Sequence, residues 1–259
     1  MTLNKNHPIP LYYQLVELIK ERIQSHELKP GNQLPSERDL SEQVGISRMT
    51  ARQAVAYLVR EGVLVVKPGV GTFVAEPKLA HNVLHLLGFT EEMMQRGGAA
   101  TSRVLEQAIV MPSLQVATGL NLASDETAIK IVRLRLSGEI PLLLETIFIP
   151  TTLCPGLEDE DLAAKSLYTL LEQRYGLHLN RTRQTLEVTT ANDYERYLFG
   201  IELGAPMILL EGVTFLDQDR PVEYFKAIYR GDRFKFELES QRNVVDEAHG
   251  APRFSLVWT

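Results

Sequence analysis

The spacing of apolar and polar residues near the start of the chain predicts helices. Residues 10–27 place Leu15 and Ile19 on one face of an amphipathic helix. Two shorter apolar stripes with three- and four-residue steps follow, within residues 36–45 and 47–62. Only a short turn separates these two stripes, so the pattern predicts two helices joined by a tight turn.

The residues at the ends of the two short helices fit that reading. Ser36 is expected to cap the first helix, with Asp39 in the acidic position of a capping box. Gly45 is expected to end it in a left-handed conformation, which glycine adopts without steric cost. Ser47 is expected to cap the second helix and Gly62 to stop it.

A glycine-tipped hairpin is predicted directly after the second helix. Residues 63–67 and 72–75 are β-prone, and Pro68-Gly69-Val70-Gly71 between them is typical of a turn. Two helices, a turn and a hairpin in this order form a winged helix-turn-helix. Lys67 and the backbone at Gly69 are then placed to approach phosphate from the wing.

The second short helix carries the chemistry expected of a groove-reading helix. Arg48 and Arg52 lie four residues apart on one side, and no acidic residue lies between Val44 and Leu58. Arginine binds guanine through two parallel hydrogen bonds, and such helices present their first turns to base edges. Ser47 and Thr50 supply hydroxyls, and Arg38 is expected near the backbone. The alternative is a solvated helix face, or a winged helix used only for protein contacts.

The remaining 180 or so residues predict an antiparallel sheet with helices, an α+β class. We expect the strands to pair in sequence with helices on one side, and residues 128–137 to form a half-buried strand. The predicted strands are residues 102–111, 128–137, 142–150, 181–191, 207–217 and 221–232, and the predicted helices are residues 88–97, 112–122, 166–176 and 192–201.

Charge is distributed unevenly along the chain. Residues 1–77 carry nine Lys or Arg and eight Asp or Glu, whereas residues 78–259 carry 18 and 25. The second part is therefore expected to bind nucleic acid poorly by itself. The single cysteine, Cys154, allows no internal disulfide, and no apolar run or signal peptide points to a membrane. We expect a cytoplasmic protein without a membrane segment.

Two arginines in the predicted sheet are candidates for binding an anion. Arg133 and Arg135 are two residues apart, so they share one face of a strand. Such a pair can hold phosphate or carboxylate through forked hydrogen bonds. The alternative is pairing with acids on neighbouring strands, for which Glu145 and Glu187 are plausible partners.

The N-terminal 75 residues resemble the GntR family of transcription regulators. The resemblance is carried by PLYYQLVELIKERI, by LKPGNQLPSERDLSEQVGISRMTARQAVAYLVREGVL and by PGVGTFV. It implies that Arg38, Arg48, Arg52 and Gly69 contact double-stranded DNA, with Ser47 and Thr50 in support. The opening PLYYQL is typical of the HutC branch, whose effector-binding domain is of the UTRA type with a chorismate-lyase-like fold.

The second part of the chain is similar to that effector-binding domain over roughly residues 84–236. GFTEEM, VRLRL, ETIFIP, SLYTLLEQRYG and RPVEYFKAIYRGDRFKF carry the similarity. In the amino-sugar-responsive members of the branch these positions line the pocket. The resemblance implies that one small anionic ligand is surrounded by eight residues, which are Phe89, Thr90, Arg133, Arg135, Glu145, Ser166, Glu223 and Tyr229.

The resulting expectation is a homodimeric repressor released from its operator by an anionic effector. Glucosamine-6-phosphate or N-acetylglucosamine-6-phosphate is the first choice, and other sugar phosphates or carboxylates are alternatives. The expected domains are residues 1–76 for DNA binding, 77–88 as linker and hinge, 89–245 for effector binding and dimerisation, and 246–259 as tail.

A chorismate-lyase-like enzyme is the rival interpretation. No arrangement of a nucleophile with a base is visible in the sequence, so no catalytic residue is assigned. His81 and His85 lie four apart, but no third ligand is near them. We therefore expect no enzyme activity, no metal site and no cofactor.

Overall fold

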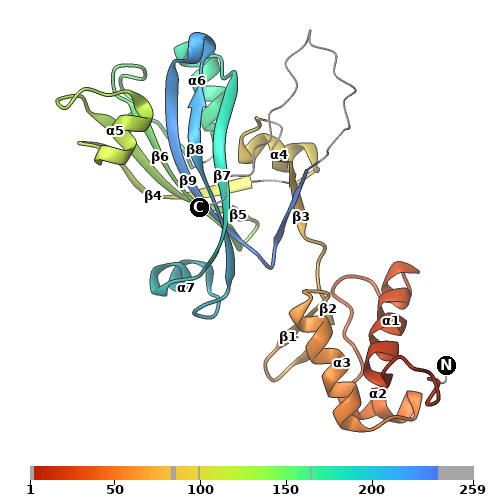
Figure 1. Ribbon diagram of the computed structural model, residues 1–259. Helices are drawn as coiled ribbons and strands as arrows, with labels where there is room; N and C mark the ends of the chain where they lie inside the picture. Colours follow the sequence, from red (N-terminus) through yellow and green to blue (C-terminus); the bar gives the residue numbers. More distant parts are fainter. Residues whose placement is uncertain (1–2, 83–85, 99, 164, 239–259) are drawn as a thin grey trace, which may run out of the picture. The chain divides into compact units, whose positions relative to one another are not determined.

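The chain divides into two compact units, Met1–Lys78 and Leu79–Thr259 (Figure 1). The computed structural model describes residues 3–82, 86–98, 100–163 and 165–238. Within these residues, no helix is both long and apolar enough to cross a membrane.

Unit 1 is a three-helix core followed by a two-stranded hairpin. The helices bury one stripe each, including Leu15, Ile19, Leu40 and Leu58, in a common apolar cluster. The first helix ends three residues earlier than expected. The elements are α1 (Leu11–Gln24), α2 (Glu37–Val44), α3 (Arg48–Arg60), β1 (Leu64–Lys67) and β2 (Gly71–Val74).

The helix ends are the ones that the sequence indicates. The Ser36 hydroxyl accepts a hydrogen bond from the backbone N–H of Asp39, and the Ser47 hydroxyl accepts one from that of Thr50. Gly45 ends α2 at a φ of 69°. Short hydroxyl caps and a left-handed glycine turn thus set the angle between α2 and α3.

The wing is an antiparallel hairpin in which Leu64 pairs with Val74 and Lys67 with Gly71. Gly69 and Gly71 have φ values of 73° and 146°, which L side chains rarely adopt. The hairpin tip is exposed. The predicted winged helix-turn-helix is confirmed.

Unit 2 is built on a six-stranded antiparallel sheet with the order β4-β5-β6-β9-β8-β7. Two three-strand meanders meet where β6 pairs with β9, so the expectation that all strands pair in sequence is wrong. The strands are β4 (Ala100–Val110), β5 (Ala128–Ser137), β6 (Ile140–Pro150), β7 (Arg181–Thr190), β8 (Pro206–Phe215) and β9 (Pro221–Arg230).

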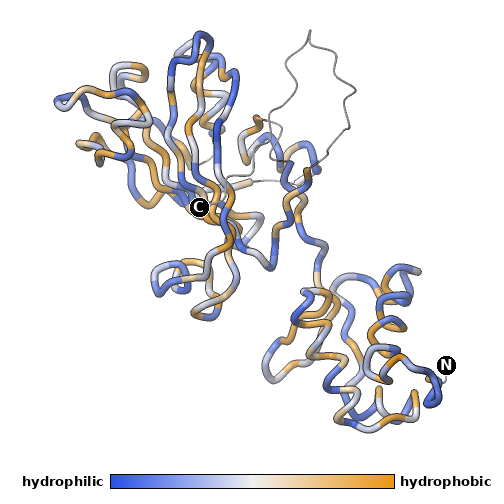
Figure 2. Tube along the Cα trace, viewed as in Figure 1, coloured by the Kyte–Doolittle hydropathy of each residue, from blue (hydrophilic) through white to orange (hydrophobic). Residues whose placement is uncertain are grey.

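Helices cover both faces of this sheet, which corrects the expectation of helices on one side. Phe89 of α4 (Phe89–Gln95) and Leu171 of α6 (Leu167–Tyr175) pack in clusters on one face. Val116 of α5 (Leu114–Leu120) and Phe199 of α7 (Asp193–Phe199) pack on the other. Consequently β5 is buried on both faces rather than half-buried. Figure 2 shows much of the hydrophobic colour on the strands and a bluer colour on the turns.

A small parallel sheet joins the start and the end of the described part of unit 2. β3 (Leu79–Asn82) pairs with β10 (Phe234–Glu237), with His81 opposite Phe236. The expected linker, residues 77–88, therefore contains a strand that belongs to unit 2. Two short 3₁₀ helices complete the elements, Leu157–Asp159 and Asp217–Asp219. The expected tail, residues 246–259, lies outside the described residues.

Candidate nucleic-acid interface and ligand pocket

The first turns of α3 present the cations predicted to read DNA. Arg52 is exposed, and no acidic side chain of the described residues lies within ion-pair distance of it. Arg48 is also exposed, and its Nε lies 3.8 Å from Glu37 Oε2, a long contact between solvated groups. Both guanidiniums thus remain available to an outside anion or base edge.

The other residues predicted to contact DNA interact with neighbouring side chains of unit 1. Arg38 Nε donates to Glu42 Oε1 at 2.9 Å on the surface of α2. The hydroxyls of Ser47 and Thr50 lie 2.8 Å apart and bond to each other. Lys67 Nζ lies 4.6 Å from the centre of the Phe73 ring. Arg38 has to exchange its surface partner to bind phosphate, which costs little because exposed ion pairs are weak.

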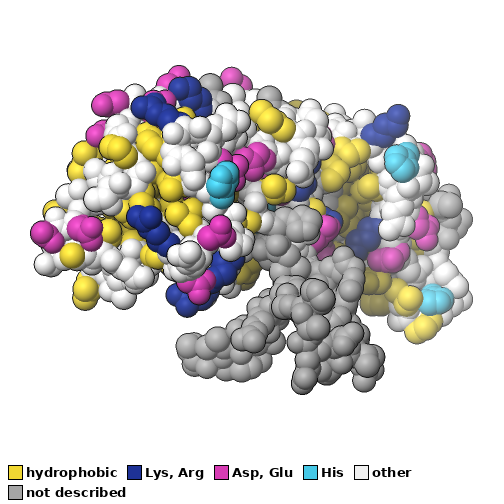
Figure 3. Space-filling view, turned by 90° about the horizontal axis from the view of Figure 1, so that it is seen from above, with side chains coloured by type: hydrophobic (Ala, Val, Ile, Leu, Met, Phe, Trp, Pro, Cys, Tyr) yellow, Lys and Arg dark blue, Asp and Glu magenta, His cyan; other side chains and the backbone are white. Residues whose placement is uncertain are grey.

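A pocket of about 470 Å³ lies between α4 and α6 in unit 2. Thr90 and Glu91 open α4 on one wall, and Ser166 and Thr169 open α6 on the other. Its lining residues are Thr90, Glu91, Met94, Lys165, Ser166, Thr169, Leu170, Gln173 and Arg174. On the face drawn in Figure 3, Lys and Arg side chains lie next to Asp and Glu, without a large patch of one sign.

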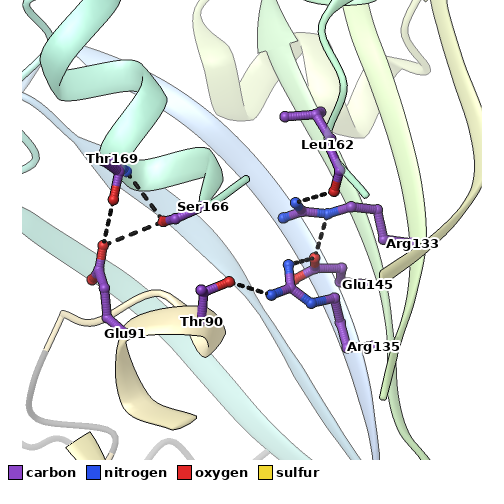
Figure 4. A network of polar contacts seen from close by, with 8 residues as sticks. All are labelled: Thr90, Glu91, Arg133, Arg135, Glu145, Leu162, Ser166 and Thr169. Atoms are coloured by element: carbon purple, nitrogen blue, oxygen red, sulfur yellow. Dashed lines mark hydrogen bonds and ion pairs between the residues drawn. The ribbon is translucent and has the colours of Figure 1, made fainter. Parts of the chain in front are cut away.

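The arginine pair of β5 lies behind the Thr90 wall of this pocket (Figure 4). Arg135 Nη2 donates to the Thr90 hydroxyl at 2.5 Å. Glu145 Oε1 lies 2.6 Å from Arg133 Nε and 3.1 Å from Arg135 Nη1. Arg133 Nη1 also donates to the carbonyl of Leu162 at 3.5 Å. Both arginines are 2% exposed, so two buried guanidiniums share one carboxylate.

The three side chains of Arg133, Arg135 and Glu145 together carry a net charge of +1. Burial alone would raise the pKa of Glu145, but the two guanidiniums hold that pKa below its usual range. Burial lowers the pKa of Arg133, and the charge of Arg135 lowers it further, against the opposing effect of Glu145. An uncompensated charge in a low-dielectric site is costly, so a bound anion would stabilise this cluster.

A second buried carboxylate stands next to the pair. Glu223 is 1% exposed and accepts hydrogen bonds from the hydroxyls of Tyr168 at 2.9 Å and Thr214 at 2.7 Å. Burial raises the pKa of Glu223 to about 7, although both hydroxyls oppose the rise. Burial therefore disfavours the ionised form of this carboxyl group, whose hydrogen-bond partners are the two hydroxyls.

The predicted aromatic residues adjoin the same cluster. The guanidinium carbon of Arg135 lies 4.9 Å from the centre of the Phe89 ring. Tyr229 is buried beside Phe234 and Phe236, and burial raises the pKa of its hydroxyl. Of the predicted ligand-site residues, only Thr90 and Ser166 line the pocket itself. Phe89 and the arginine pair adjoin it through Thr90, while Glu223 and Tyr229 lie deeper in the unit.

Sequence reasoning missed several pocket residues. Glu91 lies in the first turn of α4, and its carboxylate reaches across to α6. Thr169 follows the Ser166 cap by three residues, a position that faces the start of the helix. Lys165 and Arg174 both pair with Glu160 at the pocket rim. Glu187, weighed as a partner for the arginines, is exposed on the edge strand β7.

His81 pairs with a carboxylate of the neighbouring helix rather than with a second histidine in the described part of the chain. His81 Nδ1 lies 2.6 Å from Glu92 Oε2, and His85 lies outside the described residues. Among the residues that the structure describes, no group of three or more His, Cys, Asp and Glu side chains is arranged to hold a metal ion.

Comparison with known proteins covers both units. The family model "Bacterial regulatory proteins, gntR family" matches residues 11–74, and the UTRA domain model matches residues 95–235. The HTH-type transcriptional repressor NagR of Bacillus subtilis is 39% identical over 91% of this chain and 97% of its own. The Mannosyl-D-glycerate transport/metabolism system repressor MngR of Escherichia coli is 28% identical over 90% of this chain and 97% of its own.

A solved structure supports the fold. PhnF from Mycobacterium smegmatis superposes with a TM-score of 0.61 at 24% sequence identity, covering 89% of this chain and 99% of that one. These relatives are regulators rather than enzymes, in agreement with the expectation that the chain has no catalytic site. With a gntR-type winged helix in unit 1 and a UTRA domain in unit 2, this chain belongs to the HutC branch of the GntR family of transcriptional regulators.

Proposed function

We propose that this regulator is a homodimeric repressor that leaves its operator when an amino-sugar phosphate binds unit 2. The observation that carries the proposal is the pair Arg133 and Arg135, which share the single carboxylate of Glu145 behind the α4–α6 pocket. A phosphate monoester supplies the negative charge that this buried cluster lacks. Glucosamine-6-phosphate and N-acetylglucosamine-6-phosphate are the favoured ligands, from the resemblance to amino-sugar-responsive members of the branch.

Each part of the proposed pocket has a chemical role. Thr90 and Ser166 supply hydroxyl donors for phosphate oxygens at the pocket wall. Behind the pocket lining, Glu145, Glu223 and Tyr229 supply acceptors and a hydroxyl for a sugar that reaches the arginine pair, and Phe89 covers the guanidinium of Arg135. Another sugar phosphate or a carboxylate is the runner-up, since the arginine pair fits any compact anion.

The proposed operator contact uses the start of α3 together with the wing. Arg48 and Arg52 read base edges, while Arg38, Lys67 and the backbone at Gly69 contact phosphates. Ser47 and Thr50 support α3 and contribute hydroxyls. A duplex offers two such half-sites one turn apart, which matches a two-fold dimer in the cytoplasm.

An exposed edge of unit 2 fits the proposed dimer. β7 is an outer strand of the six-stranded sheet, and Val188 on it is 82% exposed. Tyr197 on α7 is 84% exposed. An open strand edge and exposed apolar side chains in the same unit favour association with a second copy. In light scattering, the full chain should have the mass of a dimer, and Val188→Lys should shift it toward monomer.

A thermal-shift titration tests the effector. Glucosamine-6-phosphate should raise the melting temperature of the full chain in a concentration-dependent way, because a ligand that binds only the native state stabilises it by mass action. Glucosamine without phosphate should have little effect. The same compound should release the protein from operator DNA in a fluorescence anisotropy assay. If neither amino-sugar phosphate shifts the melting temperature but another anion does, the effector is another sugar phosphate or a carboxylate.

A further inference from the structure

Glu91 occupies an unusual position at the ligand pocket. Its Oε2 accepts a hydrogen bond from the backbone N–H of Gly88 at 3.0 Å, so the side chain turns back over the start of α4. Its Oε1 faces the other wall, where the hydroxyls of Ser166 and Thr169 both lie 3.4 Å away (Figure 4). The carboxylate therefore bridges α4 and α6 across the pocket that it lines.

The groups around that carboxylate are those that bind an anion. Ser166 caps α6, a nine-residue helix whose positive end points at the carboxylate. Lys165 and Arg174 line the same pocket and share one acid, Glu160, between them. The pocket thus has two cations that share Glu160 at its rim, and two buried guanidiniums that share Glu145 behind it, with Glu223 nearby. Glu91 supplies a further negative charge from the protein itself.

The hold on Glu91 from α6 is weak. Hydroxyl–carboxylate hydrogen bonds are usually 2.5–2.7 Å long, and both contacts to Glu91 Oε1 are 3.4 Å. The neighbouring bond from Arg135 to Thr90, by contrast, is 2.5 Å. A stronger acceptor that enters the pocket can therefore take the Ser166 and Thr169 hydroxyls from Glu91 at small cost.

We propose that Glu91 is an internal ligand of the effector pocket, which holds α6 when the pocket is empty and which an anionic effector has to displace. The inference rests on the proposed location of the effector site but not on the identity of the sugar. It also assigns selectivity. A ligand carboxylate that displaces Glu91 only replaces one negative charge by another. A phosphate monoester carries about 1.5 to 2 negative charges at pH 7, so it gains more from the two rim cations and the two buried arginines.

Removal of the Glu91 charge should therefore strengthen anion binding. Glu91→Gln keeps the shape of the side chain and an acceptor oxygen for Gly88 but removes the charge. Isothermal titration of the full chain with inorganic phosphate and with glucosamine-6-phosphate should give dissociation constants about five-fold or more lower for the variant. Acetate should gain at least as large a factor, because the competing charge that excludes monoanions is gone.

A matched control separates local displacement from the overall change in charge. Glu172 lies exposed on the same helix α6 and does not line the pocket. Glu172→Gln removes one negative charge from the same unit, and its phosphate affinity should stay near that of the wild type. Equal tightening in both variants would overturn the proposal in favour of long-range electrostatics.

A second variant covers the case in which glutamine disturbs the start of α4. Glu91→Ala removes the bridging group altogether and should also bind phosphate more tightly. Phosphate affinity unchanged or lost in the folded Gln and Ala variants would overturn the proposal. Unfolding of both variants, seen by circular dichroism, would overturn it too, because an internal ligand is not required for folding.

The same titrations distinguish this inference from the proposed function. If the wild type binds neither amino-sugar phosphate, but Glu91→Gln binds inorganic phosphate more tightly than the wild type, the effector is wrong and the role of Glu91 stands. If the wild type binds glucosamine-6-phosphate and neither variant binds it more tightly, the effector stands and the role of Glu91 is wrong.

Discussion

His81 on β3 and Glu92 on α4 are joined by a buried hydrogen bond of 2.6 Å between Nδ1 and Oε2. The His81 ring packs against Tyr229 and Phe236, at ring-centre distances of 5.4 and 5.2 Å. The other oxygen of Glu92 accepts from Arg96 at 2.7 Å. The strand that begins unit 2 is thus tied to the helix whose first turn holds Thr90 and Glu91.

This tie predicts a variant that binds effector but responds poorly to it. His81→Phe keeps an aromatic ring between Tyr229 and Phe236 but removes the bond to Glu92. Effector affinity should stay close to that of the wild type. Saturating effector should weaken operator binding less in the variant than in the wild type. The effector site and the DNA-binding site are coupled only as far as the effector binds the DNA-competent and the DNA-free conformations with different affinity.

Operator-binding titrations by fluorescence anisotropy, with and without effector, measure this loss of coupling. His178 is exposed beyond the end of α6, so His178→Phe serves as the control and should be released normally. Normal release in the His81 variant would limit His81 to a packing role.

Arg52→Ala should change which operator sequences are bound. Arg52 is exposed on α3, so its loss should cost about 1–3 kcal/mol at one base position and relax preference there. Anisotropy titrations against single-base operator variants measure the effect. Arg60 stands at the other end of α3 above the Tyr57 ring, and Arg60→Ala should leave the preference unchanged. Uniform weakening on all sequences would make Arg52 a phosphate contact.

The sequence predicts the parts of this protein that depend on local chemistry. The caps at Ser36 and Ser47, the turn at Gly45 and the glycine wing each follow from a preference of the backbone at one position. The sequence also indicates Glu145 as a partner for Arg133 and Arg135, because β5 and β6 form a hairpin whose register places Glu145 opposite Arg133.

Contacts between distant segments were not predictable in this way. Glu187 was a reasonable partner for the arginines only if the strands pair in sequence, and the β6–β9 junction places β7 at the far edge instead. Likewise, Glu91 meets Ser166 from 75 positions away. Local patterns show that a segment is a strand or a helix, but they do not specify which distant segment packs against it.

Glu145→Gln should destabilise the protein strongly, because it removes the carboxylate that two buried guanidiniums share. The loss in the free energy of unfolding should be about 3–5 kcal/mol, and phosphate should recover part of it by supplying the missing charge. Urea denaturation with and without phosphate measures both effects. Glu106→Gln, which breaks a partly exposed pair with Lys130, should cost about 1 kcal/mol or less. A Glu145 variant as stable as this control would mean that the arginine pair needs no counter-charge.

Glu223 should make the stability of unit 2 depend on pH in a defined direction. Burial raises the pKa of Glu223 from 4.5 to about 7, so the native state holds a proton that the unfolded state releases. The free energy of unfolding should therefore fall as pH rises from about 4.5 to 7, by about 3 kcal/mol for this group alone. Glu223→Gln removes the titration while keeping groups that can bond Tyr168 and Thr214. The variant should consequently gain stability relative to the wild type as pH rises through this window. Urea midpoints measured at several pH values for both proteins show the effect, and a difference that does not change with pH would place the pKa of Glu223 near that of an ordinary carboxyl.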